Sequence, residues 1–222
     1  MKKLSYLLFN LLILTLPIIS KLIYQKTILP KTSYFILSAA IVAFIFIVWD
    51  IKVTDKWWFF NNRYILGVKF FKLPIEEVLF FFTVPYSCLV IFLNLDYLIK
   101  SKVYFNLYYP LTIIFIILSF YFLKNKKPYP FFVFLFLSVN ILFDYLLKVN
   151  LLNKVSFHIY IIFVLFLTLI FNFFLTSKKI VTYSNSYKTN FLVTTIPFED
   201  FIYGINLLYL NLIFYLLFQR IF

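Results

Sequence analysis

The chain has 222 residues, of which 64% are hydrophobic and 24% aromatic, and its formal net charge is +13 at pH 7. Its mean hydropathy of +0.97 means more apolar surface than a soluble domain can bury, which excludes a water-soluble globular protein and predicts an all-α integral membrane protein. The basic residues are spread through short loops, so the charge indicates loops beside anionic lipid and argues against a nucleic-acid partner.

Seven apolar segments follow one another along the chain, each near the ~20 residues that cross a bilayer as a helix. They cover residues 4–24, 33–49, 74–99, 103–123, 130–149, 155–176 and 197–219. The first follows Lys2 and Lys3, and no small-x-small cleavage site comes after it, so we interpret it as a retained anchor rather than a signal peptide. Residues 50–73 are expected to form a polar and aromatic loop.

Seven spans place the two chain termini on opposite sides of the membrane. The loops on the N-terminal side hold thirteen of the 21 Lys and Arg residues, and those on the other side hold eight. Because basic loops stay on the cytoplasmic side, we expect a protein of the cell (inner) membrane with a cytoplasmic N-terminus.

One short motif occurs twice. Pro74-Ile75-Glu76-Glu77 opens the third span, and Pro197-Phe198-Glu199-Asp200 opens the seventh, 123 residues later. We expect a first three-span repeat at 1–99, a linking span at 100–126 and a second repeat at 127–222. Because the linking span restores the orientation, the two repeats are predicted to be parallel, with both acid pairs on the same membrane face.

Rare residue types exclude several kinds of site. The two glycines are too few for a G-x-G-x-x-G or Walker A loop, which excludes the usual nucleotide, flavin and nicotinamide sites. A single cysteine, Cys88, and a single histidine, His158, cannot build a disulfide, a cysteine cluster or a multi-histidine metal centre. We therefore expect neither a cofactor nor a metal.

The candidate catalytic residues are Glu76, Glu77, Glu199 and Asp200. Each proline suits the start of a helix, and an acid in the first turn is explained simply by the helix dipole. A repeated doublet in a chain with eight acids favours proton chemistry, in which a protonated carboxylic acid donates and an ionised neighbour accepts. Adjacent helical residues point about 100° apart, so one acid of each pair should face the bundle interior; which one stays open.

Several other residues near the motif are candidates for substrate binding or support. They are Trp49, Asp50, Asn62, Arg63 and Asn185, the last at the position in the second copy that Asn62 has in the first. Arg63 either holds one carboxylate ionised or is a solvated loop cation. Aromatic faces would stabilise a carbocation, although most of the 33 Phe and 18 Tyr are ordinary lipid-facing or interfacial residues.

These residues resemble the membrane-embedded lycopene cyclase domain, which occurs as two small subunits or as one fused chain. The first copy carries Trp49-Asp50, Asn61-Asn62-Arg63-Tyr64, Gly67, Pro74-Ile75-Glu76-Glu77 and Phe80-Phe81, and the second carries Tyr183, Asn185 and Pro197-Phe198-Glu199-Asp200-Phe201. The second copy departs at Ser186, which stands in the place of Arg63, and at Asn190, which stands in the place of Gly67. We therefore expect unequal halves.

The resemblance implies a lycopene β-cyclase, an intramolecular lyase or isomerase that closes the open ψ-ends of lycopene into β-rings without net redox change. An acid protonates the terminal double bond, the neighbouring double bond attacks the tertiary cation, and loss of a proton completes the ring. The two acid pairs would act as acid and base, with Asp50 and Arg63 as supporting groups. Lycopene would enter from the bilayer, and association with other carotenoid enzymes is a further expectation.

Two functions from other classes stay open. A small-solute or ion transporter would suit parallel repeats and intramembrane acids, although glycine-poor helices are unlike the broken helices of transporter sites. A non-catalytic scaffold for carotenoid assembly is the other. A retinal-binding protein needs a lysine in its last helix, and residues 197–219 contain none.

Overall fold

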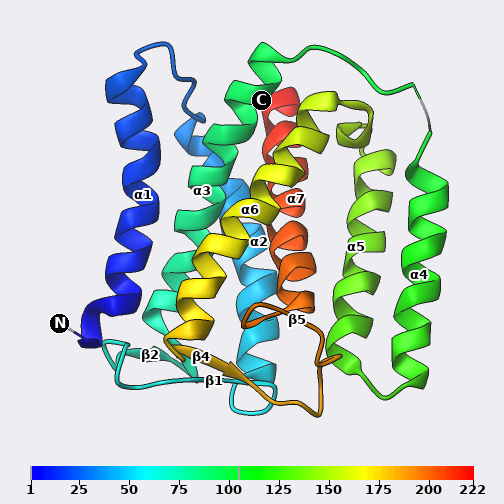
Figure 1. Ribbon diagram of the computed structural model, residues 1–222. Coiled ribbons are helices and arrows are strands. Elements are labelled where there is room, and N and C mark those ends of the chain that lie inside the picture. The colour runs from blue at the N-terminus through cyan, green and yellow to red at the C-terminus, as the bar shows by residue number, and fades with distance from the viewer. Residues whose placement is uncertain (1, 105) are drawn as a thin grey trace.

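The computed structural model describes residues 2–104 and 106–222, and these form seven α-helices that stand side by side (Figure 1). The helices are α1 (Ser5–Ile23), α2 (Thr32–Val53), α3 (Ile75–Leu98), α4 (Tyr108–Lys124), α5 (Pro128–Leu146), α6 (Val155–Ser177) and α7 (Phe198–Ile221). Six are long and apolar enough to cross a membrane, and α4, with 17 residues, is a shorter apolar helix. The predicted all-α membrane architecture is confirmed.

Every predicted span contains one helix, but two boundaries differ in ways that matter. The second helix continues beyond Trp49 to Val53, so Asp50 lies within α2 and not in the loop where we had expected it. No Gly or Pro interrupts this stretch, and the carbonyl of Asp50 accepts a helical hydrogen bond from the N–H of Thr54 (2.8 Å). The fourth helix starts at Tyr108, five residues later than predicted, with Pro110 in its first turn, where proline is tolerated.

Six short strands gather at the end of the bundle that holds the N-terminus (Figure 1). Strand β1 (Trp58–Phe60) pairs antiparallel with β4 (Val181–Tyr183), β2 (Lys69–Phe70) with β3 (Leu73–Pro74), and β5 (Leu192–Val193) with β6 (Ile196–Pro197). The sequence pattern does not predict these strands, because they are two or three residues long and give almost no periodic signal. Strands β3 and β6 lead directly into α3 and α7.

The two halves of the chain have the same order of elements, displaced by 123 residues. Helices α1 and α5 have 19 residues each, and α3 and α7 have 24 each. Strand β1 pairs with its own counterpart β4, with Phe59 opposite Thr182, which is also its counterpart. A strand that pairs antiparallel with its own counterpart indicates a local two-fold axis that relates the two halves. Because α1 and α5 run in the same direction, the repeats are parallel, as predicted (Figure 1).

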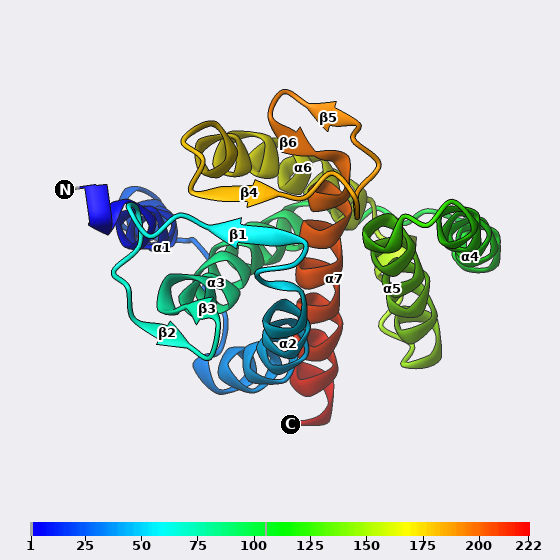
Figure 2. The same ribbon diagram turned by 90° about the horizontal axis from the view of Figure 1, so that it is seen from below.

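Helices α3 and α7 form the centre of the molecule, as the view from below shows (Figure 2). Helices α1, α2, α5 and α6 surround them, and α4 packs on the outside of α5. The outer face of α6 carries exposed apolar side chains, among them Ile162, Phe163 and Phe166. These faces suit contact with lipid. The first turns of both central helices lie at the end of the bundle that carries the strands (Figure 1).

Candidate active site

Three carboxyl groups from three helices line one cavity of about 490 Å³, and they lie in the part of it at the strand-bearing end of the bundle. They belong to Asp50 of α2, Glu77 of α3 and Asp200 of α7. Both repeats therefore contribute, because β3 and β6 bring the first turns of α3 and α7 to the same level. Four tyrosines and a tryptophan complete this end of the cavity: Tyr6, Trp58, Tyr129, Tyr183 and Tyr203.

Each of the three carboxyl groups accepts a hydrogen bond from a tyrosine. The hydroxyl of Tyr6 donates to Glu77 Oε2. The hydroxyl of Tyr129 donates to Asp200 Oδ1 at 2.9 Å, and that of Tyr203 donates to Asp50 Oδ1 at 2.7 Å. Tyr6 and Tyr129 are 123 residues apart, so the first two pairs are counterparts in the two repeats. These bonds fix the positions of the carboxyl groups.

Asp200 has more hydrogen-bond donors than the other two acids. Its Oδ2 accepts from the hydroxyl of Tyr183 at 2.6 Å and from Nδ2 of Asn172 at 3.5 Å, in addition to the bond from Tyr129. Tyr183 lies on β4, outside the spans. Desolvation, with a smaller contribution from the nearby Asp200, raises the pKa of Tyr183 well above its ordinary value, so its hydroxyl stays a donor.

The other acid of each pair points away from the cavity into the preceding loop. Glu76 Oε1 accepts the backbone N–H of Leu66 at 2.6 Å, and Glu199 Oε1 accepts that of Thr189, also at 2.6 Å. Both side chains are fully buried. Each thus fastens the backbone ten residues upstream to the first turn of its helix. The sequence left open which acid faces inward; here Glu77 and Asp200 do.

The loop residues expected to support the site lie outside the cavity. Asn62, Arg63 and Asn185 are exposed. Arg63 bonds through its backbone N–H to Asn61 Oδ1 (3.0 Å) and does not line the cavity, so of the two alternatives left open for it, the solvated loop cation agrees with the structure. A guanidinium is strongly favoured in water, and the site obtains its donors from tyrosines instead.

Trp49 also lies outside the cavity, although Asp50 beside it lines the cavity. The ring of Trp49 packs against Trp57 at a centroid distance of 5.2 Å and against Phe132 at 4.7 Å. These contacts join the ends of α2 and α5. Trp49 therefore packs between helices and supports the site indirectly.

Sequence reasoning missed most of the tyrosines that hold the acids. Tyr6 and Tyr129 carry a signal, because their spacing of 123 residues is the spacing of the two acid pairs. Tyr203 carries a weaker one, since it follows Asp200 by three residues and therefore shares its helical face. Asp50 and Tyr203 are bonded across 153 residues, a contact with no local signal.

Beyond the carboxyl groups the lining of the cavity is mostly apolar, with a few Ser, Thr and Asn side chains. It continues between α1, α3 and α6, where its lining includes Leu16, Val84, Leu98, Val164 and Leu167. Among residues 2–104 and 106–222, no group of three His, Cys, Asp or Glu side chains is placed to hold a metal ion. The arrangement can move protons to and from an apolar molecule whose end reaches the carboxyl groups.

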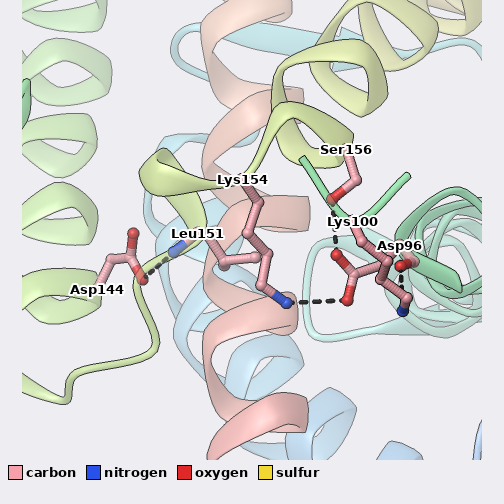
Figure 3. A network of polar contacts seen from close by, with 6 residues as sticks. All are labelled: Asp96, Lys100, Asp144, Leu151, Lys154 and Ser156. Atoms are coloured by element: carbon pink, nitrogen blue, oxygen red, sulfur yellow. Dashed lines mark hydrogen bonds and ion pairs between the residues drawn. The ribbon is translucent and has the colours of Figure 1, made fainter. Parts of the chain in front are cut away.

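A second polar cluster lies at the opposite end of the bundle (Figure 3). Asp144 Oδ1 accepts the backbone N–H of Leu151 at 3.0 Å, while Asp96 forms an ion pair with Lys154 at 2.9 Å and accepts a hydrogen bond from Ser156 at 2.6 Å. These bonds fasten the turn between α5 and α6, which contains a short 3-10 helix, Leu151–Asn153. Neither Asp96 nor Asp144 lines the cavity, and the bonds of this cluster connect parts of the fold.

Comparison with known proteins gives one family. A family model described as "Lycopene cyclase" matches residues 3–95 and 126–218, so the two matched segments are also displaced by 123 residues. No curated protein and no solved structure matches the chain.

Proposed function

Because the chain belongs to the lycopene cyclase family, and so to the carotenoid cyclases, we propose that it is a lycopene β-cyclase that acts by proton transfer. The proposal rests on one observation: three tyrosine-bonded carboxyl groups meet at the end of an apolar cavity. An apolar polyene is a substrate of matching chemistry, and acid–base groups are what a cyclisation without redox change requires.

Glu77 is the proton donor in this proposal. Its proton adds to the terminal double bond of a ψ-end, which leaves a tertiary carbocation on the neighbouring carbon. The electron pair of the next reachable double bond then forms the carbon–carbon bond that closes the ring, and the positive charge moves to a ring carbon. Glu77 is left as a carboxylate, with the hydroxyl of Tyr6 as its hydrogen-bond donor.

Asp200 is the proton acceptor. Tyr129, Tyr183 and Asn172 donate to its two oxygens, and hydrogen bonds to a carboxylate favour the ionised form. Asp200 takes a proton from the carbon beside the cation, and the freed electron pair becomes the double bond of the ring. The net result is one proton moved from Glu77 to Asp200, which is reversed before the next turnover.

Asp50 and the aromatic rings stabilise the cation between these two steps. Asp50 is held by Tyr203 in the same cavity, and Trp58 and Tyr183 also line it. The oxygen atoms of a carboxyl group and aromatic faces in a site shielded from water lower the energy of a carbocation. Since the position of the base selects the proton that leaves, Asp200 would also decide in favour of the β-ring.

The membrane setting completes the proposal. Lycopene reaches the cavity from the bilayer, and the N-terminus, on the face with more basic loop residues, is cytoplasmic in the cell (inner) membrane. Association with other carotenoid enzymes would pass the substrate along without exposure to water.

Pigment analysis of a lycopene-accumulating bacterium tests the proposal. We expect the native chain to produce ringed carotenoid, and Glu77→Gln and Asp200→Asn to leave lycopene unchanged while reaching the membrane in normal amounts. Asp96→Asn, which alters an acid at the opposite end, serves as the matched control and should keep activity. Lycopene left uncyclised by a well-inserted native chain would contradict the proposal and favour a transport or scaffold role.

A further inference from the structure

The cavity extends well beyond the carboxyl groups and lies on one side of the local two-fold axis. It follows α3 from Glu77 to Leu98, which corresponds to about 32 Å at a rise of 1.5 Å per residue. That length is close to the ~30 Å thickness of the hydrocarbon core of a bilayer. Helices α2 and α5 contribute to the lining only Asp50 and Tyr129, both at the carboxyl end. We call the remainder, between α1, α3, α6 and α7, the groove.

The equivalent space in the other half is filled by side chains. The two-fold axis relates the groove to the region between α5, α7, α2 and α3. Phe46, Phe81 and Leu210 are buried there in one apolar cluster, and Phe136 and Phe214 pack against it. The ring of Phe46 lies 6.0 Å from that of Phe81 and 5.5 Å from that of Phe136.

One pair of counterparts accounts for much of this difference. Gly204 of α7 lines the groove, and the residue 123 positions earlier is Phe81, which is fully buried in the filled half. A Cβ atom at Gly204 would lie 3.5 Å from Thr168 Oγ1, an ordinary contact, so alanine fits there but a ring does not fit without entering the groove. A second pair of counterparts differs in the same way: the small Ser87 lines the groove, and the larger Leu210 is buried in the filled half.

Glycine at this position is costly for the helix. Within a helix glycine is less favourable than alanine by about 1 kcal/mol, and nothing in the backbone conformation of Gly204 requires it. The absent side chain leaves the space in the groove.

We propose that the groove holds the polyene chain of one carotenoid molecule, with one ψ-end at Glu77 and Asp200 and the rest along α3, and that Gly204 provides the room. The proposal rests on the proposed function for the identity of the occupant. The length of the groove, its mostly apolar lining and its continuity with the carboxyl groups fit a linear polyene. Because the second groove is filled, the enzyme closes one end at a time, and the monocyclic product must leave and return reversed.

A binding measurement tests the groove independently of ring formation. The Glu77→Gln chain, purified from lycopene-accumulating cells, should carry about one lycopene per chain by visible absorbance. Adding Gly204→Ala should leave this unchanged, whereas adding Gly204→Phe should lower it about tenfold or more, because a ring overfills the occupied space. If Gly204→Phe does not fold, Leu167→Trp, on the half-buried groove wall of α6, replaces it.

Equal lycopene in the folded Gly204→Phe chain, or membrane lipid alone in the Glu77→Gln chain, would overturn the groove proposal. A time course with the native chain tests the second part: free monocyclic carotenoid should appear before the bicyclic product. Bicyclic product from the earliest times with no free monocyclic form would overturn reaction at one end at a time. A native chain that binds lycopene but forms no ring would contradict the proposed function while supporting the groove.

Discussion

The two acids in the first turn of α3, like the two in the first turn of α7, have different surroundings because they are adjacent in the sequence. On a helix they point about 100° apart, so Glu77 and Asp200 reach the cavity while Glu76 and Glu199 reach the loop. The inner pair bonds to tyrosine hydroxyls, and the outer pair bonds to backbone N–H groups. In the proposed mechanism, the repeated doublet thus combines a reactive group with a group that positions the preceding loop.

Substitutions at Glu76 should separate these two roles. Glu76→Gln keeps a carbonyl oxygen for the N–H of Leu66, so we expect ring formation near the native level. Glu76→Ala leaves a buried N–H without its acceptor and should lower stability by about 1–3 kcal/mol. Membrane yield, melting in detergent and pigment content provide the measurements. Loss of activity in Glu76→Gln with normal melting would instead make Glu76 a reacting group.

The tyrosine bonds should contribute to rate more than to stability. Tyr6→Phe and Tyr129→Phe remove the hydroxyl from Glu77 and Asp200 respectively, with little change in volume. We expect ring formation to slow by up to about 100-fold, because a carboxyl group that loses its orientation reacts less often. The effect of Tyr129→Phe should be smaller, since Tyr183 still donates to Asp200. Initial rates on lycopene in membranes would measure both, and equal effects would contradict this ranking.

At the scale of elements, Asp144 connects several elements that are not counterparts of one another in the two repeats. It lies at the end of α5 and accepts hydrogen bonds from Tyr108 of α4 (2.7 Å), Tyr209 of α7 (2.8 Å) and the N–H groups of Leu151 (3.0 Å) and Leu152 (3.2 Å). It is fully buried. One carboxylate thus connects the linking helix, the second repeat and the turn before α6.

Loss of this carboxylate should therefore destabilise the fold and not the chemistry. Asp144→Ala leaves two buried tyrosine hydroxyls and two N–H groups without an acceptor, and we expect a loss of about 3 kcal/mol or more. Lys154→Ala breaks a partly exposed ion pair but leaves Asp96 bonded to Ser156, so it should cost about 1 kcal/mol or less. Detergent melting curves compare the two. Rings formed per folded chain should stay the same in both, and a selective loss of activity in Asp144→Ala would contradict a structural role.

At the scale of the whole molecule, the site belongs to neither half alone. Asp50, Glu77 and Tyr6 come from the first repeat, while Asp200 and Tyr129 come from the second. Strands β1 and β4 join the halves at the end of the cavity that holds the carboxyl groups. Helices α3 and α7 pack against each other at the centre. Along the chain, the loop before α5 separates helices α1 to α4 from helices α5 to α7.

A chain divided in that loop should reassemble. We expect residues 1–126 and 127–222, coexpressed as two chains, to copurify and form rings, whereas either chain alone leaves lycopene unchanged, because each lacks carboxyl groups of the site. Copurification with an affinity tag on one chain and pigment analysis measure this. Ring formation by a single half would contradict a site shared between the repeats, which we propose as units at 1–99 and 127–222 with a linking span at 100–126.

The orientation in the membrane is a second prediction at this scale. The termini lie at opposite ends of the bundle (Figure 1). Reporter fusions that are active only in the cytoplasm should give signal at the N-terminus and none at the C-terminus, because the N-terminal face has more basic loop residues. The opposite pattern would reverse the orientation, and signal at both termini would mean that α4 does not cross.

The sequence alone determined the helices, the repeat and the acid doublets, because hydrophobicity and motif spacing are local properties that repeat along the chain. It also pointed to the family through these motifs. It named Asp50 and Arg63 alike as supporting candidates, and it did not determine that only Asp50 of these two lines the cavity or that tyrosines hold the carboxyl groups.

Those features depend on contacts between distant residues, such as Tyr6 with Glu77 across 71 positions and Tyr203 with Asp50 across 153. The unequal grooves are of the same kind: Gly204 and Phe81 are single residues in two similar helices, and their effect depends on which helices pack beside them. The pattern of the chain therefore specified the elements, and the packing of the two repeats against each other decided which side chains share a cavity.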